Sequence, residues 1–212
     1  LIELGGTAGE YQNIIYYEAY RIMKMTLPKD VILLHVTYFP TPSHINELKS
    51  KPTQLSVKAL NSMGIQPDFI VGRGELVIDE KRKEKIAYYC TMNREDIISN
   101  PDCKSNYEIP LIFNRQNFSQ KVLKKLGLKA KKIALTNWQN MVNNVYAKKE
   151  KPVKIGIIAK YIATGNYELK DSYASLLEAL NHSAWHQKID LEVVFINAES
   201  LEKKKSQQDG EL

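Results

Sequence analysis

The feature that most constrains the fold is an alternation of short, continuously apolar runs with helix-type patterns. The clearest run, residues 31–38, is rich in β-branched residues, as are the buried strands of parallel sheets. Shorter runs of the same kind follow at 68–71 and 96–99, and helical patterns separate them. Strands that alternate with helices are typical of parallel pairing, so the sequence predicts an α/β fold with a mainly parallel sheet.

Helices are expected between these runs, where apolar residues recur at a spacing of three and four. The expected helices are 13–25, a segment from Pro52 to a stop at Gly64, 79–90, 109–113, 118–126 and 136–146. A short strand end is expected at 1–4, directly before the glycine-rich turn at 5–9. The first part of the chain therefore carries several helix and strand pairs, and no internal repeat is visible.

A second unit is expected after the polar, charged stretch 148–152, which is typical of a linker. Residues 153–159 predict a strand, 172–182 a helix and 191–196 a second strand. This order is one βαβ unit, which is too short for a complete domain, so we expect it to open a second α/β domain. The polar segment 202–210 lacks apolar periodicity and is expected to be disordered or a loop.

Composition restricts the class of protein. Hydrophobic residues make up 43% of the 212 residues, which is ample for a core, and no segment approaches the length of a membrane span. No signal peptide is visible, and Cys90 and Cys103 lack metal-ligand spacing, so a cytoplasmic protein is the simplest interpretation. Residues 1–3 are not a translation start, so we expect the chain to begin inside a longer protein.

The net charge of +6 and a pI near 9.1 raise the hypothesis of nucleic-acid binding. Most lysine clusters, however, contain apolar residues at helical spacing, as at Val122, Leu123 and Leu126, and this pattern is typical of a solvated helix face. No recognition motif or aromatic platform accompanies the lysines. A modest positive excess also suits small polyphosphates, and this partner class is favoured here over nucleic acid or a membrane.

One segment carries a clear pattern for phosphate binding. Two lysines, two hydroxyls and an amide lie within six residues, which are Lys49, Ser50, Lys51, Pro52, Thr53 and Gln54. Pro52 suits a first helical position, because the N–H that it lacks would be unpaired there anyway. A helix N-terminus carries free N–H groups and partial positive charge, so an anion is expected there, with phosphate the leading candidate. A solvated, lysine-flanked helix start is the alternative interpretation.

Three further residues invite a chemical interpretation. Glu3 ends an expected strand just before a glycine turn, and a carboxylate at that edge of a sheet is well placed to hold Mg²⁺. Arg73 follows the strand at 68–71 in the same way, which suits contact with a phosphate. An exposed loop acid and a surface salt bridge are the respective alternatives. His35 lies inside an apolar strand and is more typical of a core histidine than of a base.

Taken in order, these segments resemble those of CTP synthases nearly end to end. The matching stretches are 2–9, 48–54, 56–58, 64–68, 85–90, 107–111 and 156–161. The Lys-Pro-Thr-Gln stretch from Lys51 to Gln54 and the Gly-Ile-Gln-Pro-Asp stretch from Gly64 to Asp68 are highly specific to that family. The resemblance covers essentially the whole chain, whereas the chain would cover only the middle of such an enzyme.

The resemblance implies a fold and an activity. Residues 1–147 would be the later part of a synthetase (amidoligase) domain with a Rossmann-like sheet of the P-loop or dethiobiotin-synthetase type. Residues 148–152 would be a linker, and 153–212 the truncated start of a class I glutamine amidotransferase domain. Such a ligase phosphorylates the uracil O4 of UTP with ATP, and ammonia from glutamine then displaces the phosphate. A homotetramer and activation by GTP are further implications.

The resemblance also assigns site residues, none of them catalytic. Glu3 would bind Mg²⁺, and Lys49, Ser50, Lys51, Pro52, Thr53, Gln54 and Lys85 would bind UTP or CTP. Glu10, Tyr11 and Gln12 would contact inhibitory CTP, and Arg73, Asn100, Pro101, Asp102 and Cys103 would lie at the ATP site.

The chain departs from the family pattern at several points. The stretch from Glu10 to Gln12 is less acidic than usual, so weaker CTP inhibition is expected, and Ser50 replaces a threonine. Neither the phosphate-binding loop nor the amidotransferase cysteine is found, so we expect the chain to be inactive by itself. A stand-alone nucleotide-binding or regulatory module is the alternative function.

Overall fold

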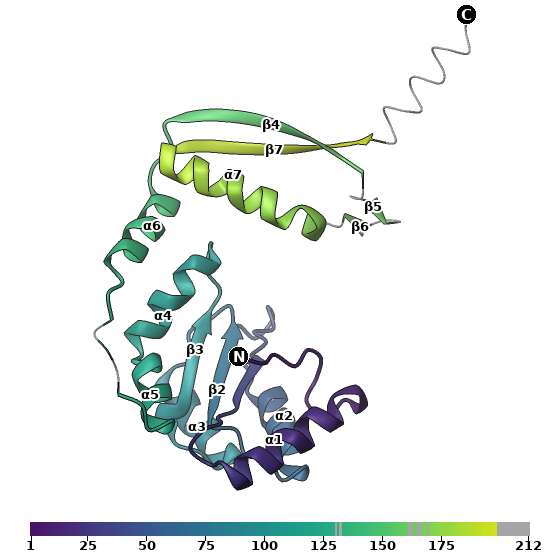
Figure 1. The fold of residues 1–212 in the computed structure, drawn as a ribbon, viewed down its shortest axis with the longest axis vertical. Helices are drawn as coiled ribbons and strands as arrows, with labels where there is room; N and C mark the ends of the chain where they lie inside the picture. The colour runs from purple at the N-terminus through teal and green to yellow at the C-terminus, as the bar shows by residue number, and fades with distance from the viewer. Residues whose placement is uncertain (130, 132, 161–162, 165–166, 169, 199–212) are drawn as a thin grey trace, which may run out of the picture. The chain divides into compact units, whose positions relative to one another are not determined.

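The computed structural model describes residues 1–129, 131, 133–160, 163–164, 167–168 and 170–198. These residues form two compact units, Leu1–Ile133 and Ala134–Leu212 (Figure 1). Tyr161, which belongs to one of the family-like stretches, and the polar segment 202–210 lie outside the described residues. Within the described part of the chain, no helix combines the length and the apolar character that crossing a membrane requires.

The first unit is built on a parallel three-stranded sheet. Strands β1 (Leu34–Tyr38), β2 (Phe69–Gly74) and β3 (Ile97–Pro101) lie in the order β1-β2-β3, and both neighbouring pairs are parallel. The predicted α/β class with parallel pairing is therefore confirmed. Because the strands are parallel, their carboxyl ends meet at one edge of the sheet, where ligands bind in open α/β folds.

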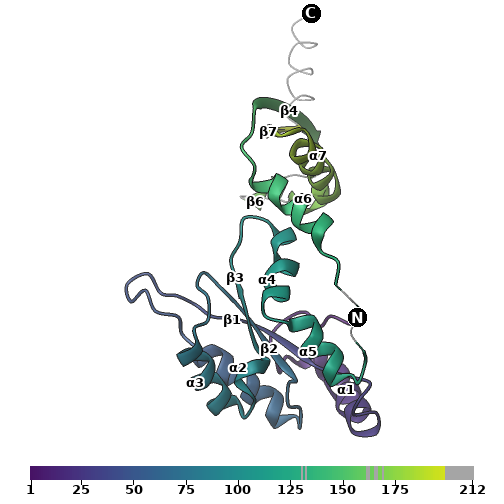
Figure 2. The ribbon, with the colours of Figure 1, turned by 90° about the vertical axis from the view of Figure 1, so that its left-hand side faces the viewer.

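Helices cover both faces of this sheet (Figure 2). The helical elements of this unit are η1 (Tyr11–Asn13), α1 (Ile14–Thr26), α2 (Lys51–Ser62), α3 (Glu80–Cys90), η2 (Arg94–Asp96), η3 (Asn106–Glu108), α4 (Ile109–Arg115) and α5 (Phe118–Lys125). Side chains alternate between the faces of a strand. Accordingly, Ile70 and Ile97 pack with α2 and α3, whereas the neighbouring residues Phe69 and Ile98 pack with α5.

Strand β1 differs from the predicted buried run at 31–38. It begins only at Leu34, because the preceding backbone groups bond elsewhere: Val31 O accepts from Lys24 Nζ at 2.9 Å, and Leu33 N donates to Asp68 Oδ2 at 2.9 Å. The prediction that both faces of this strand are buried was also wrong. Val36, like every second residue of the strand, is exposed, since α4 and α5 cover β2 and β3 on that side.

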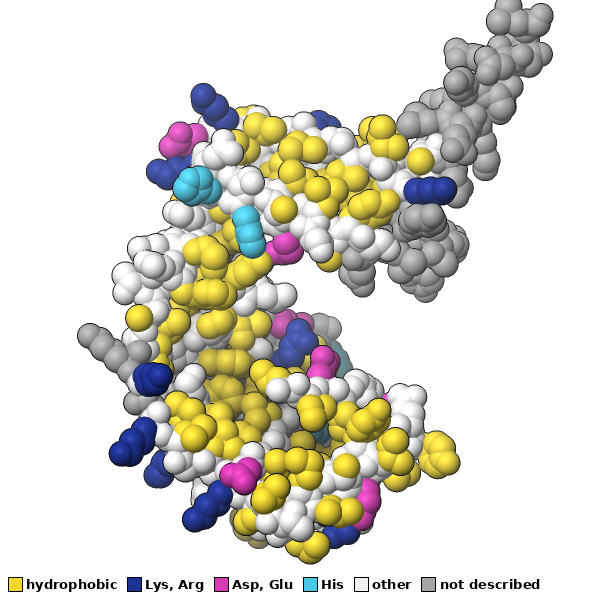
Figure 3. Space-filling model, viewed as in Figure 1, with side chains coloured by type: hydrophobic (Ala, Val, Ile, Leu, Met, Phe, Trp, Pro, Cys, Tyr) yellow, Lys and Arg dark blue, Asp and Glu magenta, His cyan; other side chains and the backbone are white. Residues whose placement is uncertain are grey.

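Residues 1–4 do not form the predicted strand. Leu4 instead packs beside Tyr17 of α1 and Leu60 of α2, so its burial does not come from pairing with a neighbouring strand. Apolar side chains also remain exposed on the other side of α1, where they gather in the lower part of Figure 3. The exposed large hydrophobic residues of that helix are Ile14, Ile15, Tyr16, Ile22, Met23 and Met25.

The second unit contains the predicted βαβ arrangement. Strands β4 (Lys151–Ala159) and β7 (Ile189–Asn197) are parallel, and helix α7 (Ala174–Gln187) packs on them through Leu177 and Leu180. The remaining elements are α6 (Thr136–Tyr146), β5 (Ala163–Thr164), β6 (Tyr167–Glu168) and η4 (Lys170–Tyr173).

The boundary between the two compact units falls before α6, at Ile133, and the predicted linker at 148–152 overlaps the start of β4. The assignment of the two units to two enzyme domains stays a prediction.

A close passage of backbone over β2 fixes the course of the chain after β1. Phe39 N donates to Arg73 O at 2.7 Å, and the Phe39 ring lies against Gly72. A Cβ at Gly74 would lie 2.6 Å from the backbone oxygen of Phe39, which is closer than real Cβ contacts. Glycine at both positions is therefore required for the loop after β1 to cross the carboxyl end of β2.

This passage predicts the effect of one substitution. Gly74→Ala is expected to lower the free energy of unfolding by about 1–3 kcal/mol, because a backbone atom has to move to admit the methyl group. Gly5→Ala is the matched control, since no atom lies within 4 Å of a Cβ placed there, and its effect should stay within about 0.5 kcal/mol. Urea denaturation of both variants measures the difference. Equal stability of the two variants would show that the loop adjusts freely.

Candidate functional site

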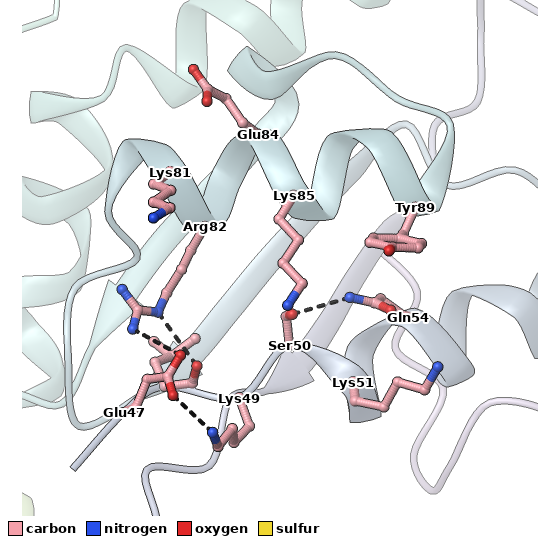
Figure 4. Close-up of a pocket in the computed structure, with 11 residues that line it drawn as sticks. Glu47, Lys49, Ser50, Lys51, Gln54, Lys81, Arg82, Glu84, Lys85 and Tyr89 are labelled. Carbon is pink, nitrogen blue, oxygen red and sulfur yellow. Dashed lines mark hydrogen bonds and ion pairs between the residues drawn. The ribbon is translucent and has the colours of Figure 1, made fainter. Parts of the chain in front are cut away.

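A pocket of about 640 Å³ lies between the start of α2 and α3 (Figure 4). This volume falls within the roughly 300–1,000 Å³ that is usual for small-molecule sites. The lining residues are Glu47, Leu48, Lys49, Ser50, Lys51, Gln54, Lys81, Arg82, Glu84, Lys85 and Tyr89. The loop before α2 and its first turn supply one wall, and one side of α3 supplies the other.

The first wall is held by the loop that leaves β1 at Phe39. Lys49 N donates to Pro40 O at 2.9 Å, which closes this loop on itself. Leu48 is buried in the same cluster as Phe39, Val57 and Ile86, so apolar packing fixes the backbone next to Lys49. The start of α2 is thereby held against the sheet, and its first turn faces the pocket.

The second wall is set by the start of α3. Asp79 caps this helix by accepting from Arg82 N at 2.8 Å, and Ile78 N donates to the buried Ser99 Oγ at 3.0 Å. Ile86 is fully buried on the inner side of α3. On the opposite side, residues four apart along a helix lie on one face, and Lys81, Lys85 and Tyr89 have this spacing.

The structure brings together five of the seven residues that were predicted to bind UTP or CTP. They are Lys49, Ser50, Lys51, Gln54 and Lys85, and Gln54 Nε2 donates to Ser50 Oγ at 3.0 Å. Helix α2 begins at Lys51, one residue before the predicted start, so Pro52 lies within its first turn.

Two of the seven residues do not line the pocket. Pro52 is exposed outside it. Thr53 is fully buried, and its Oγ1 lies 3.1 Å from Thr37 Oγ1 of β1. Their predicted contacts with a nucleotide stay predictions without support from this geometry.

Positive charge dominates the pocket. Five of the lining residues are lysine or arginine, and two are glutamate. Among the residues that the structure describes, Lys51, Lys81 and Lys85 make no ion pair with a carboxylate (Figure 4). Charge-assisted hydrogen bonds from such ammonium groups suit phosphate oxygens, so the pocket matches a polyphosphate anion.

The sequence reasoning missed Lys81, Arg82 and Tyr89 as pocket residues. The charged stretch around Lys85 was interpreted as a solvated helix face, and only Lys85 was selected through the family resemblance. The spacing of 81, 85 and 89 on one helical face was the available signal. Recognising it required knowing that this face lies opposite the first turn of α2.

The residues predicted for ATP gather at the carboxyl edge of the sheet, apart from the lining of this pocket. Arg73 and Asn100 are register partners, Gly74 pairs with Pro101, and Asp102 N donates to Gly74 O at 2.9 Å. Asn100 is buried, and its Oδ1 has no hydrogen-bond partner in the described structure. A polar acceptor next to an exposed guanidinium is compatible with a nucleotide site there.

Neither cysteine has the character of a reactive thiolate. Burial raises the pKa of the Cys90 thiol to about 11. Burial, followed by the carboxylates of Glu108 and Asp102, also raises the pKa of Cys103. Both groups are therefore neutral thiols near pH 7.

The residues predicted to contact inhibitory CTP do not line the pocket. Glu10 Oε2 accepts from Gln12 Nε2 at 2.9 Å, and hydrogen bonds from Thr7, chiefly that of its backbone, lower the pKa of the Glu10 carboxyl. Tyr11 is 89% exposed. The three residues thus form a short surface segment next to the glycine turn.

Glu3, the predicted Mg²⁺ ligand, is an exposed carboxylate. The described residues contain no group of three or more His, Cys, Asp or Glu side chains arranged to hold a metal ion. Mg²⁺ is commonly bound by one or two carboxylates together with phosphates and water. Glu3 therefore fits as a single ligand to a phosphate-bound Mg²⁺, and it does not form a complete metal site.

His35 has the predicted character of a structural histidine. Its Nε2 lies 2.6 Å from Ser56 Oγ of α2, and burial lowers its pKa. The imidazole is therefore neutral near pH 7 and links β1 to α2.

The lysine face of α3 gives a direct test of the pocket. Lys81→Ala is expected to weaken binding of inorganic tripolyphosphate about threefold to tenfold, because one unpaired cation is lost from the lining. Lys58→Ala is the control, since it removes the same charge from an exposed position of α2 outside the pocket. Calorimetric titration at low salt measures both affinities. Equal losses in the two variants would mean that only net charge matters.

Comparison with known proteins identifies relatives of the whole segment. Residues 1–128 match a family model described as "CTP synthase N-terminus". Similar proteins named CTP synthase include those of Bdellovibrio bacteriovorus, 39% identical over 202 residues, Koribacter versatilis, 41% over 205, and Methanococcus maripaludis, 38% over 205. These alignments cover 95–96% of this chain and 36–37% of the relatives, so the chain spans little more than a third of their length.

Proposed function

Because the chain belongs to the CTP synthase family, we propose that the protein containing it is a ligase that converts UTP into CTP in pyrimidine nucleotide synthesis. ATP phosphorylates the uracil O4 in this reaction, and ammonia derived from glutamine displaces the phosphate. The observation that carries the proposal is the pocket in which five residues of the family-specific set, among them Lys49 and Lys85, converge from the loop before α2, the first turn of α2, and α3.

The pocket between α2 and α3 is proposed to hold the triphosphate of UTP or of the product CTP. Lys49, Lys51 and Lys85 supply charge-assisted hydrogen bonds to phosphate oxygens, and Lys81 adds a fourth ammonium group. Ser50 and Gln54 supply neutral donors and acceptors at the start of α2. On the opposite wall, the Tyr89 ring offers an apolar surface near the end of α3.

The carboxyl edge around Arg73 and Asn100 is proposed to hold ATP, together with Pro101, Asp102 and Cys103. The guanidinium of Arg73 would neutralise negative charge that develops during phosphoryl transfer. When bound, Mg²⁺ supplies further neutralisation of the phosphates, and Glu3 is the residue of this chain that would contact it.

Inhibition by CTP through Glu10, Tyr11 and Gln12 also belongs to the proposal. Since these residues do not line the pocket, they are proposed to lie against a nucleotide that is bound in another copy of the chain. A homotetramer, as the family resemblance implies, supplies such contacts. The exposed apolar side chains of α1 support this idea, because contiguous apolar surfaces commonly mark protein interfaces. Activation by GTP rests on the resemblance alone, whereas a cytoplasmic location is proposed from the cysteine usage.

The assignment of the second unit is a separate proposal. The match to the family model ends at residue 128 and speaks for the synthetase part only. The βαβ unit of β4, α7 and β7 is proposed to open a glutamine amidotransferase domain, because its first strand carries a family-like Gly-Ile-Ile-Ala-Lys stretch, residues 156–160. The alternative is a nucleotide-binding or regulatory module derived from such an enzyme, which would bind nucleotide without forming CTP.

The proposed reaction has a simple test. The complete protein is expected to form CTP from UTP, ATP, Mg²⁺ and ammonia, and chromatography of the nucleotides detects the product. Replacing ammonia with glutamine separately tests the amidotransferase part. A folded complete protein that binds UTP but yields no CTP would support the regulatory module instead.

Substitutions in the two proposed sites should affect the KM values for UTP and ATP differently. Lys49→Ala is expected to raise the KM for UTP about tenfold or more, because one charge-assisted phosphate contact contributes about 1.5–3 kcal/mol. The KM for ATP should change much less. Arg73→Ala is the reciprocal variant, and it is expected to raise the KM for ATP more than the KM for UTP. If Lys49→Ala shifted the KM for ATP instead, or changed neither the KM for UTP nor that for ATP, the assignment of the pocket would be wrong.

A further inference from the structure

One carboxylate lies among the cations of the pocket. Glu47 Oε2 accepts from Lys49 Nζ at 2.8 Å, and Glu47 Oε1 lies 3.5 Å from Arg82 Nη2 (Figure 4). The hydrogen bond from Lys49 is the main cause that lowers the pKa of the Glu47 carboxyl, and the charges of Lys49, Arg82 and Lys85 add to it. Glu47 is therefore ionised near pH 7 and neutralises part of the positive charge.

The two cations that contact Glu47 differ in their other contacts. Arg82 also pairs with Asp79, and its Nε donates to Leu48 O at 3.4 Å, so it stays anchored without Glu47. For the Lys49 ammonium group, the contact with Glu47 is the one seen in the described structure. Lys49 would therefore be the cation that changes partner when another anion arrives.

The Lys49–Glu47 pair is also easily exchanged. The side chains are 37% and 50% exposed, so water screens their attraction and can replace either partner. A phosphate oxygen carries the same type of acceptor as the carboxylate and can take its place on Lys49. Glu47 left beside a bound polyphosphate would then repel it.

From these contacts we infer that Glu47 is an internal counter-ion of the pocket that competes with ligand phosphate for Lys49. This inference rests on the proposed function, since it assumes that the pocket takes a polyphosphate. In this role Glu47 lowers the affinity of the site for phosphate, because its carboxylate occupies Lys49 until a phosphate replaces it. The opposite role, in which Glu47 orients Lys49 to improve binding, makes the opposite prediction.

The chain offers a matched control in Glu84. This residue also lines the pocket and carries the same charge, but its carboxylate points away from the cations in Figure 4 and lies 3.2 Å from Arg94. Glu84→Gln therefore reports the general effect of removing one negative charge. Glu47→Gln removes the charge and also weakens the direct competition for Lys49.

The experiment is a titration of the wild-type chain and its variants with inorganic tripolyphosphate at low salt and near-neutral pH. Glu47→Gln is expected to bind about three- to tenfold more tightly than wild type, and Glu84→Gln to change less than about twofold. Combined with Lys49→Ala, the Glu47→Gln substitution should lose most of its gain. In the complete enzyme, Glu47→Gln should lower the KM for UTP and leave that for ATP unchanged.

The other outcomes each overturn a defined statement. Weaker or equal binding by Glu47→Gln, with tripolyphosphate still bound by wild type, overturns the inference and leaves the phosphate pocket standing. Equal gains from Glu47→Gln and Glu84→Gln also overturn it, because net charge would then suffice as the explanation. If the folded wild type does not bind tripolyphosphate, the proposed phosphate pocket fails together with the inference.

Discussion

The close passage of Phe39 over Gly72 and Gly74 is the constraint on which the pocket depends. It turns the chain after β1 across the carboxyl end of β2, and the loop then closes through the hydrogen bond from Lys49 N to Pro40 O. Helix α2 starts directly after this loop, beside α3. A side chain at Gly74 would displace the backbone of Phe39 and, with it, the starting point of the pocket wall. Two glycines that do not line the pocket thus help to determine where its lysines lie.

The same apolar cluster supports both walls. Phe39, Leu48, Val57 and Ile86 belong to one buried group, so the loop, α2 and α3 share a core beneath the charged surface. Helical periodicity then divides the six-residue motif at the start of α2. Lys51 and Gln54 face the pocket, whereas Thr53 turns inward to β1. A contiguous motif on a helix therefore cannot place all of its side chains on one ligand, and part of it serves the packing of the helix instead.

The sequence predicted the parallel α/β class and most elements, because apolar runs and helical spacing are local signals. It could not predict the polar interface of β1 with α2, in which His35 bonds Ser56 and Thr37 bonds Thr53, since the pattern of 31–38 suggested burial on both faces. For the site, Lys49 was found through the local phosphate-binding pattern at the helix start, and Lys85 through the family resemblance. Lys81 and Glu47 were missed, because the sequence does not show that α3 lies opposite the start of α2, where Lys81 lines the pocket and Glu47 contacts Arg82 as well as Lys49.

The charges of the pocket also have to be compatible with folding. Five cations on two adjacent walls repel one another, and this repulsion opposes the packing of α2 against α3. Asp79 and Glu47 offset part of it by pairing with Arg82 and Lys49. Lys51, Lys81 and Lys85 are exposed, so screening by water keeps the repulsion between their charges small. The arrangement thus reconciles a stable fold with a charge excess, because two of the five cations are paired with carboxylates and the other three are exposed to solvent.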